Sequence, residues 1–282
     1  MNVQSGVIRR LSGRLAAAGT LLLAVCSQAS AAPELRVCLL AHSPPYASRD
    51  EDKGFDLDVA REVATKLGRS LQPVWTDNPV AIQEIEDSNI PLRRLTKGAC
   101  DAILSVPSPA KDTLKEYPAL ALGAPYYGAA FELIGVAGTP PYLKDLHEKQ
   151  VAIQAQTIAS FAIAILQGKQ RTYFSPRAAL EGVQRGEAAA GLLWGPTAGW
   201  ELQQSPKLAL EIAKGYEPPP ALAWNLCVAT RDKDAALREA LDGVLREMTA
   251  AGRLQALAAR YGMPWHAPFA TTYSLTEINK LR

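Results

Sequence analysis

The sequence predicts an α/β protein built as two lobes that are joined by two crossing strands. Strand-like and helix-like segments alternate over residues 35–106 and alternate again from residue 151 onward, a pattern typical of parallel sheets covered by helices. Two apolar extended segments, FELIGV at 131–136 and WNLCVAT at 224–230, link these two series. Two amphipathic helices follow the second extended segment, so we expect the chain to cross back and finish on the first lobe.

In the first series, the strand LRVCLL at 35–40 leads through a proline-bearing loop into an amphipathic helix. We expect Asp56 to cap this helix, because apolar residues recur at helical spacing from Leu57 onward and Gly68 ends the pattern. The remaining predicted elements are a strand LQPVW at 71–75, a short helix at 89–98 and a strand DAILSV at 101–106.

In the second series, VAIQ at 151–154 is predicted to be a strand, and Thr157 is predicted to cap the apolar helix that follows. Pro196 stands at the start of another helix, a position at which proline is tolerated. The series also contains a predicted helix at 177–185 and a predicted strand AAAGLLW at 188–194, and the proline run at 218–220 breaks it.

The first 31 residues have the pattern of a cleavable secretory signal peptide. Three arginines precede an apolar run at 15–25 and a small-x-small site at 29–31. The alternative is a lipoprotein with its lipid on Cys26, but Val25 is larger than the residue usual before such a cysteine. No later segment has a run of about 18 apolar residues. We therefore expect a periplasmic mature chain that is not inserted in the membrane.

Length and charge narrow the class of protein. The formal charge of the whole chain is +2, and removal of the three arginines in the signal peptide changes it to −1. Nucleic-acid binding would need a basic patch, so no such partner is expected. About 250 residues remain, enough for two lobes. We predict a monomer in which lobe 1 spans 32–136 and 221–282, and lobe 2 spans 137–220.

Three cysteines remain after cleavage: Cys38, Cys100 and Cys227. An odd number in an oxidising compartment indicates one disulfide and one buried thiol. Cys38 lies in the first strand and Cys100 precedes a later strand of the same sheet, so we predict a Cys38–Cys100 bridge. The alternative is three buried thiols that pack as small hydrophobic side chains. The three histidines have no metal-ligand spacing, and neither a metal nor another cofactor is expected.

Several short segments occur in a characteristic order along the mature chain. They are LRV at 35–37, PPY at 44–46, GFDLDVAREVATKLG at 54–68, G-x-CDAILS at 98–105, PYY at 125–127, DLHEKQVAIQAQT at 145–157 and GRLQALAARYG at 252–262. In this order the chain resembles the extracellular solute-binding proteins of family 3, the polar amino-acid type. The resemblance implies a type II periplasmic binding protein fold, in which two α/β lobes close on a ligand, usually for delivery to an ABC permease.

Two positions depart from the amino-acid-binding pattern of that family. Amino-acid binders usually place an arginine after the third strand to hold the ligand carboxylate, and here Lys111 occupies that place. Arginine is a planar two-pronged donor, whereas lysine is a point charge. These binders also place an aspartate after a strand of the second lobe to hold the ligand ammonium, and here Trp194 stands instead. The resemblance therefore implies a ligand other than a standard α-amino acid.

A narrower resemblance rests on the LRVC start, the Gly-x-Cys-Asp strand and the WGPTAGW segment at 194–200. These features are similar to the solute-binding-like accessory proteins associated with PQQ-dependent alcohol dehydrogenases, including the J-type proteins of periplasmic methanol oxidation. The resemblance implies a small-molecule ligand, and either an ABC permease or a PQQ-dependent dehydrogenase as the protein partner.

The predicted ligand-binding side chains lie in loops or at strand ends, where open α/β sheets bind ligands. They are Tyr46, Lys111, Gln154, Thr157 and Trp194. Each has a packing or hydrogen-bonding role as its alternative; for Thr157 the two roles are an anion grip at a helix start and a plain N-cap. The sequence contains no constellation typical of catalysis. Asp56 and Glu132 are the carboxylates closest to such a role, and we do not expect an enzyme.

Overall fold

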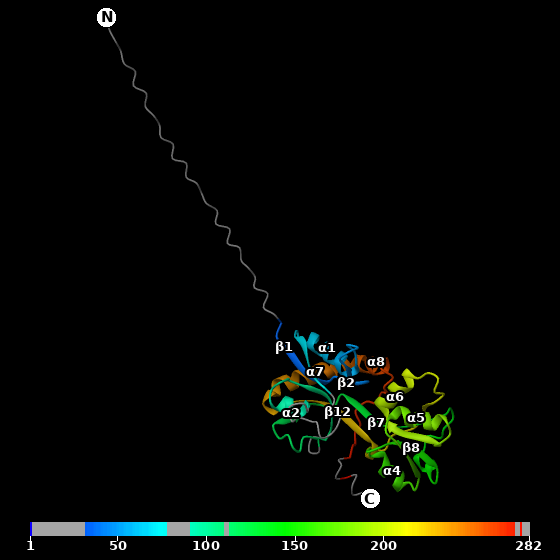
Figure 1. Ribbon diagram of the computed structural model, residues 1–282. Helices are drawn as coiled ribbons and strands as arrows, with labels where there is room; N and C mark the ends of the chain where they lie inside the picture. Colours follow the sequence, from blue (N-terminus) through cyan, green and yellow to red (C-terminus); the bar gives the residue numbers. More distant parts are fainter. Residues whose placement is uncertain (2–31, 78–90, 110–112, 274–276, 278–282) are drawn as a thin grey trace. The chain divides into compact units, whose positions relative to one another are not determined.

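The structure, a computed structural model, describes residues 1, 32–77, 91–109, 113–273 and 277. The predicted signal peptide and the predicted ligand-binding residue Lys111 lie outside these described residues. The α/β fold class is confirmed by the order of strands and helices (Figure 1). Below, lobe 1 and lobe 2 keep the boundaries predicted above.

Lobe 1 begins with a parallel pair of strands joined by a helix. β1 (Glu34–Leu40) pairs with β4 (Ser70–Thr76), and α1 (Phe55–Lys66) connects them. α2 (Pro91–Thr96) then leads to β5 (Ile103–Pro107), and a parallel bridge between Val37 and Ala102 joins β1 to the start of β5. α1 buries its apolar face in the core of this lobe, and each of its larger side chains there, such as Phe55 and Leu57, contributes about 1.5–3 kcal/mol.

The start of α1 differs from the prediction. Gly54, not Asp56, is the N-cap residue, and it has a φ of 142°. Glycine is required there because a Cβ would clash with the carbonyl oxygen of Tyr46. The prediction of Asp56 as the cap is therefore wrong. Its side chain lies in the first helical turn and hydrogen-bonds to Ser105 instead.

The two predicted crossings are confirmed as neighbouring antiparallel strands. β7 (Tyr127–Gly135) is buried at all nine positions, and its first half pairs with β12 (Ala223–Arg231). The second half of β7 pairs with β10 (Ala190–Trp194), so one strand serves both lobes. The resulting strand order is β5-β12-β7-β10-β8-β9.

Lobe 2 has a parallel set of strands covered by helices. β10 pairs with β8 (Gln150–Gln154), which pairs with β9 (Lys169–Tyr173). β9 was not predicted, because Lys169, Gln170, Arg171 and Thr172 are polar and exposed at the edge of the sheet. The helices of this lobe are α4 (Ala159–Ile165), α5 (Pro176–Gln184) and α6 (Gly195–Gln204).

The last two helices of the chain pack beside α1. α7 (Ala235–Ala250) and α8 (Arg253–Arg260) share a hydrophobic core with α1 (Figure 1). After α8, the chain passes along the crossing strands: the backbone N–H of Gly128 donates to the carbonyl of His266, and the side-chain amide of Asn225 exchanges two hydrogen bonds with the backbone of Phe269.

Short elements complete the fold. They are β2 (His42–Ser43), β3 (Ala47–Ser48), β6 (Leu120–Leu122), β11 (Glu211–Ile212) and 3₁₀ turns at 143–146, 220–222 and 232–234. Within the described residues, none of the helices has both the length and the apolar character to cross a bilayer.

Candidate functional site

A pocket of about 390 Å³ opens where β1 and β5 end. This is the place that the sheet topology predicts for a ligand, since ligands bind at the carboxyl ends of strands in open α/β sheets. Its walls are mostly apolar. The described residues that line it are Cys38, Leu39, Leu40, Ser43, Tyr46, Ala47, Asp56, Pro91, Ile103, Leu104, Ser105, Pro107, Trp194 and Leu226.

Tyr46 and Trp194, two of the five predicted ligand-binding residues, meet in this pocket. The indole Nε1 of Trp194, the last residue of β10, donates a 3.0 Å hydrogen bond to the phenol oxygen of Tyr46 in lobe 1. The Trp194 ring also packs edge-on against Phe131 and Trp224, with centroids 5.5 Å and 5.9 Å away. A contact between the lobes therefore forms one wall of the pocket.

Gln154 and Thr157, two further predicted ligand-binding residues, contact each other. The Thr157 hydroxyl donates to the carbonyl of Gln154 at 2.8 Å. α4 begins at Ala159 with Ile158 as its N-cap residue and no side-chain cap, so the predicted N-cap role of Thr157 is wrong. Among the described residues that line the pocket, neither of the two occurs. Their roles as ligand contacts stay predictions.

A polar cluster that includes two lining residues, Asp56 and Ser105, was not predicted as a binding site. The Ser105 hydroxyl donates to Oδ1 of Asp56 at 2.6 Å and lies 3.1 Å from the hydroxyl of Tyr126. The backbone N–H of Ser105 donates to the same Tyr126 oxygen at 2.8 Å. Ser105 has a φ of 52°, a costly conformation for a residue with a side chain, and such outliers gather at functional sites.

Burial raises the pKa values of the two ionisable side chains in this cluster, Asp56 and Tyr126. Asp56 is 7% exposed. Burial raises the pKa of its carboxyl group to about 7, although the hydrogen bond from Ser105 opposes the shift. Burial also raises the pKa of Tyr126 well above its ordinary value. Near neutral pH, the pocket therefore holds a carboxyl group that exists both with and without its proton.

The sequence around Asp56 contains one indication of this role, although we predicted from it that Asp56 is a helix cap. Asp56 stands between Phe55 and Leu57, both fully buried at the start of α1. An acid at a helix start suggests a cap. An acid on the buried side of that start also indicates a polar group facing the ends of the strands, which is the arrangement found here.

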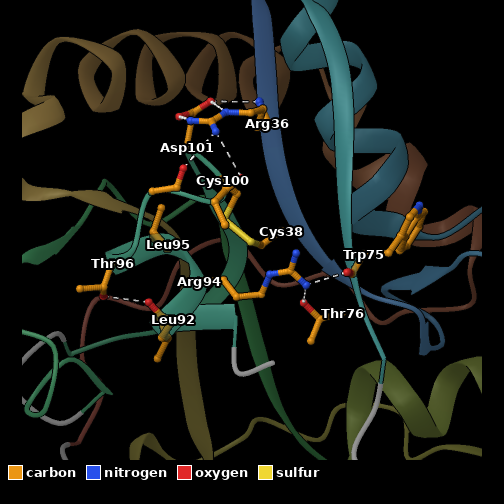
Figure 2. Close-up of a disulfide and its surroundings, with 12 residues drawn as sticks. Arg36, Cys38, Trp75, Thr76, Leu92, Arg94, Leu95, Thr96, Cys100 and Asp101 are labelled. Atoms are coloured by element: carbon orange, nitrogen blue, oxygen red, sulfur yellow. Dashed lines mark hydrogen bonds and ion pairs between the residues drawn. A yellow bond between two sulfur atoms is a disulfide. The ribbon is translucent and has the colours of Figure 1, made fainter. Parts of the chain in front are cut away.

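The predicted Cys38–Cys100 disulfide is confirmed (Figure 2). Cys227 is buried and forms no disulfide. The bridge joins β1 to the turn that precedes β5, and Cys38 lines the pocket. It therefore holds together the two strands whose ends form the pocket.

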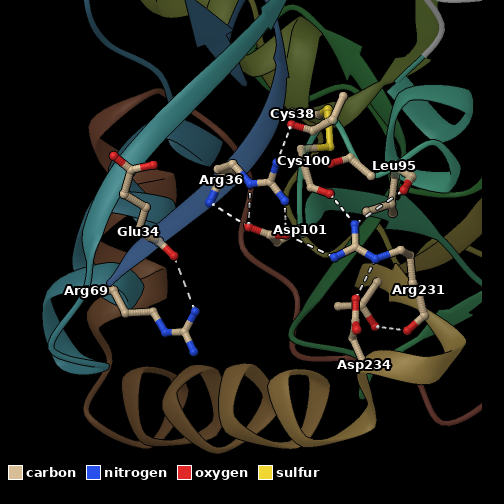
Figure 3. Close-up of polar contacts among 12 residues, drawn as sticks. Glu34, Arg36, Cys38, Arg69, Leu95, Cys100, Asp101, Arg231 and Asp234 are labelled. Atoms are coloured by element: carbon tan, nitrogen blue, oxygen red, sulfur yellow. Dashed lines mark hydrogen bonds and ion pairs between the residues drawn. A yellow bond between two sulfur atoms is a disulfide. The ribbon is translucent and has the colours of Figure 1, made fainter. Parts of the chain in front are cut away.

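The turn before β5 is also held by hydrogen bonds and ion pairs to Asp101, the residue after Cys100 (Figure 3). Arg36 donates to both carboxylate oxygens of Asp101, at 3.0 Å and 2.7 Å, and Arg231 of β12 donates to one of them at 3.0 Å. Arg231 also donates to the carbonyl of Cys100. Burial alone would raise the pKa of Asp101, but the hydrogen bonds from the two arginines hold it below its ordinary value.

Glu132, the other carboxylate considered in the sequence, lies on β7 and is 1% exposed. Its Oε1 is 2.6 Å from Nε2 of His266. This pair links the crossing strand to the segment after α8, so Glu132 has a structural partner and is not among the described residues that line the pocket.

Comparisons with known proteins agree with this architecture. Residues 35–264 match the model of the bacterial extracellular solute-binding proteins, family 3. Protein MoxJ of Methylorubrum extorquens is 23% identical over 298 residues, which cover 89% of this chain and 93% of MoxJ. The periplasmic binding protein XoxJ of Methylobacterium extorquens superposes with a TM-score of 0.59 at 21% identity, over 83% of this chain and 99% of XoxJ.

The L-cystine solute receptor of Neisseria gonorrhoeae, in its unliganded open conformation, superposes with a TM-score of 0.68 at 16% identity. That match covers 82% of this chain and 93% of the receptor. The similarity to MoxJ confirms the narrower resemblance to the J-type proteins. Because the family model matches most of its length, the chain belongs to the bacterial extracellular solute-binding proteins of family 3.

Proposed function

We propose that the protein is a periplasmic solute-binding protein that closes on a small ligand other than a standard α-amino acid, within the subgroup associated with quinoprotein dehydrogenases. The observation that carries this proposal is the lining of the pocket between Tyr46 and Trp194. Its size and mostly apolar walls are those of a small-molecule site.

A standard α-amino acid presents an ammonium and a carboxylate, and the site must match both. Among the described residues that line the pocket, Asp56 is the one charged side chain. A ligand carboxylate next to it would meet a like charge in a partly desolvated site. The N–H of Trp194, a donor that could otherwise serve a carboxylate, is already used by Tyr46.

Isothermal titration calorimetry with the 20 standard amino acids tests the ligand class. We expect no saturable heat at micromolar concentrations. Micromolar binding of any of them would contradict the proposed class and would show that the site lies elsewhere.

A second candidate function is that of an accessory partner of a PQQ-dependent alcohol dehydrogenase, with no role in transport. The similarity to MoxJ over 89% of the chain favours it. A pull-down from periplasm with the mature chain is expected to recover a quinoprotein in that case, and Trp194→Ala tests whether the cleft takes part. A small solute that raises the melting temperature while no quinoprotein is recovered would favour the first function.

A cleft enzyme, such as a dehydratase, is the third candidate, and no observation favours it. The family and the fold are those of binding proteins. Glu132 is paired with His266, and Asp56 accepts a hydrogen bond from Ser105. We propose no catalytic step.

A further inference from the structure

The base of the pocket contains an acceptor without a full set of partners. Ser105 uses Oδ1 of Asp56, and among the described residues no hydrogen bond reaches Oδ2. The side chain is more than nine-tenths buried and lines the pocket. A carboxylate oxygen that lines a mostly apolar pocket can accept a hydrogen bond from a ligand, and a hydrogen bond to a charged acceptor is stronger than one between neutral groups.

The walls above Asp56 suit a cation with an apolar body. Leu39, Leu104 and Leu226 are apolar surfaces, and the rings of Tyr46 and Trp194 add two aromatic groups. Aromatic faces attract ammonium groups, and the attraction is strongest where water is excluded. Among the described lining residues there is no basic side chain, so nothing there competes for the carboxylate.

We propose that the pocket binds a small organic ammonium, in which a protonated amine pairs with Asp56 and a compact apolar body lies against Tyr46 and Trp194. This proposal rests on the proposed function and names the ligand class of the same site. Asp56, supplied by α1 of lobe 1, takes the role of ammonium partner that Trp194 cannot fill in lobe 2. Ser105 positions Asp56 through the hydrogen bond to Oδ1.

Three probes of nearly equal shape test the charge preference: benzylamine, benzyl alcohol and benzoate. Titration calorimetry at pH 8 is expected to give benzylamine a dissociation constant at least tenfold lower than that of benzyl alcohol, a difference typical of one charged hydrogen bond. Benzoate is expected to bind more weakly than either. Quenching of tryptophan fluorescence provides a second readout, since Trp194 forms part of the wall.

The variant Asp56→Asn keeps the shape of the side chain and an oxygen that accepts from Ser105. It is expected to bring the ratio of amine to alcohol affinity close to one. Asp232→Asn, which removes an exposed carboxylate outside the pocket, is the matched control and is expected to keep the wild-type ratio.

Equal affinity for amine and alcohol in the wild type, or an unchanged preference in Asp56→Asn, would overturn the ammonium proposal and leave a solute-binding cleft intact. Absence of saturable binding by all three probes at millimolar concentration would overturn the ammonium proposal. If the mature chain still recovers a quinoprotein in that case, the accessory function stands without it.

Discussion

Removal of the buried charge at Asp56 is expected to stabilise the protein, and to do so more strongly as the pH rises. Burial raises the pKa of this carboxyl group from 3.8 to about 7 on folding. A group whose pKa is raised holds its proton more tightly in the folded state. Its contribution to stability is therefore fully present below pH 3.8 and is lost as the pH rises through about 7.

The difference between the two pKa values sets the size of the effect. At about 1.4 kcal/mol per pH unit, ionisation of Asp56 costs the folded state about 4 kcal/mol once the pH exceeds 7. The variant Asp56→Asn carries no charge at this position, and its side-chain oxygen still accepts the hydrogen bond from Ser105. The variant should therefore exceed the wild type in free energy of unfolding by a margin that grows by about 3 kcal/mol between pH 5 and pH 8.

Urea denaturation of both proteins at several pH values measures this margin. Asp232→Asn is the control, because it removes one exposed carboxylate that lies outside the pocket. A margin for Asp56→Asn that is equal at pH 5 and pH 8, or that falls with pH, would refute the argument. It would mean that the carboxylate has a stabilising partner in the folded protein.

Three further changes have expected outcomes. Replacing Cys38 and Cys100 together by alanine should lower the free energy of unfolding by about 4 kcal/mol, given a separation of 62 residues, and an unchanged urea midpoint would contradict this. A double-mutant cycle of Tyr46→Phe and Trp194→Phe should give a coupling energy of about 1 kcal/mol, whereas additive effects would show that the hydrogen bond is not formed. Burial raises the pKa of Cys227 to about 12, so a thiol reagent at pH 8 should modify one cysteine of the oxidised mature chain after denaturation and none before it.

The sequence predicted the elements whose burial leaves a clear pattern. β7 and β12 are buried almost throughout and appear as the continuous apolar segments FELIGV and WNLCVAT. β9 shows the opposite case, because an edge strand that exposes four of its five residues has no apolar pattern to detect. The disulfide was predictable, since Cys38 lies in one strand and Cys100 precedes another, and a parallel bridge between Val37 and Ala102 holds these two segments side by side.

The site was predictable only in part. Tyr46 and Trp194 were each selected for their places at strand ends, but their hydrogen bond joins residues 148 positions apart and depends on how the lobes pack. Asp56 fits the local pattern of a helix cap. Its actual environment is set by Ser105, 49 residues later, whose unusual backbone conformation places its hydroxyl next to the carboxylate. Local patterns contain no information about such contacts.

The order of strands in the sheet also determines when each lobe can be completed during synthesis. β8, β9 and β10 follow one another along the chain and pair together, so they can assemble from one continuous stretch. β5 must wait for β12, which is synthesised only after all of lobe 2. Pairing across such a distance is slow, and an unpaired strand edge invites association with other chains. A chain that stopped near residue 220 would leave β5 without its neighbour and would be prone to aggregate through that edge.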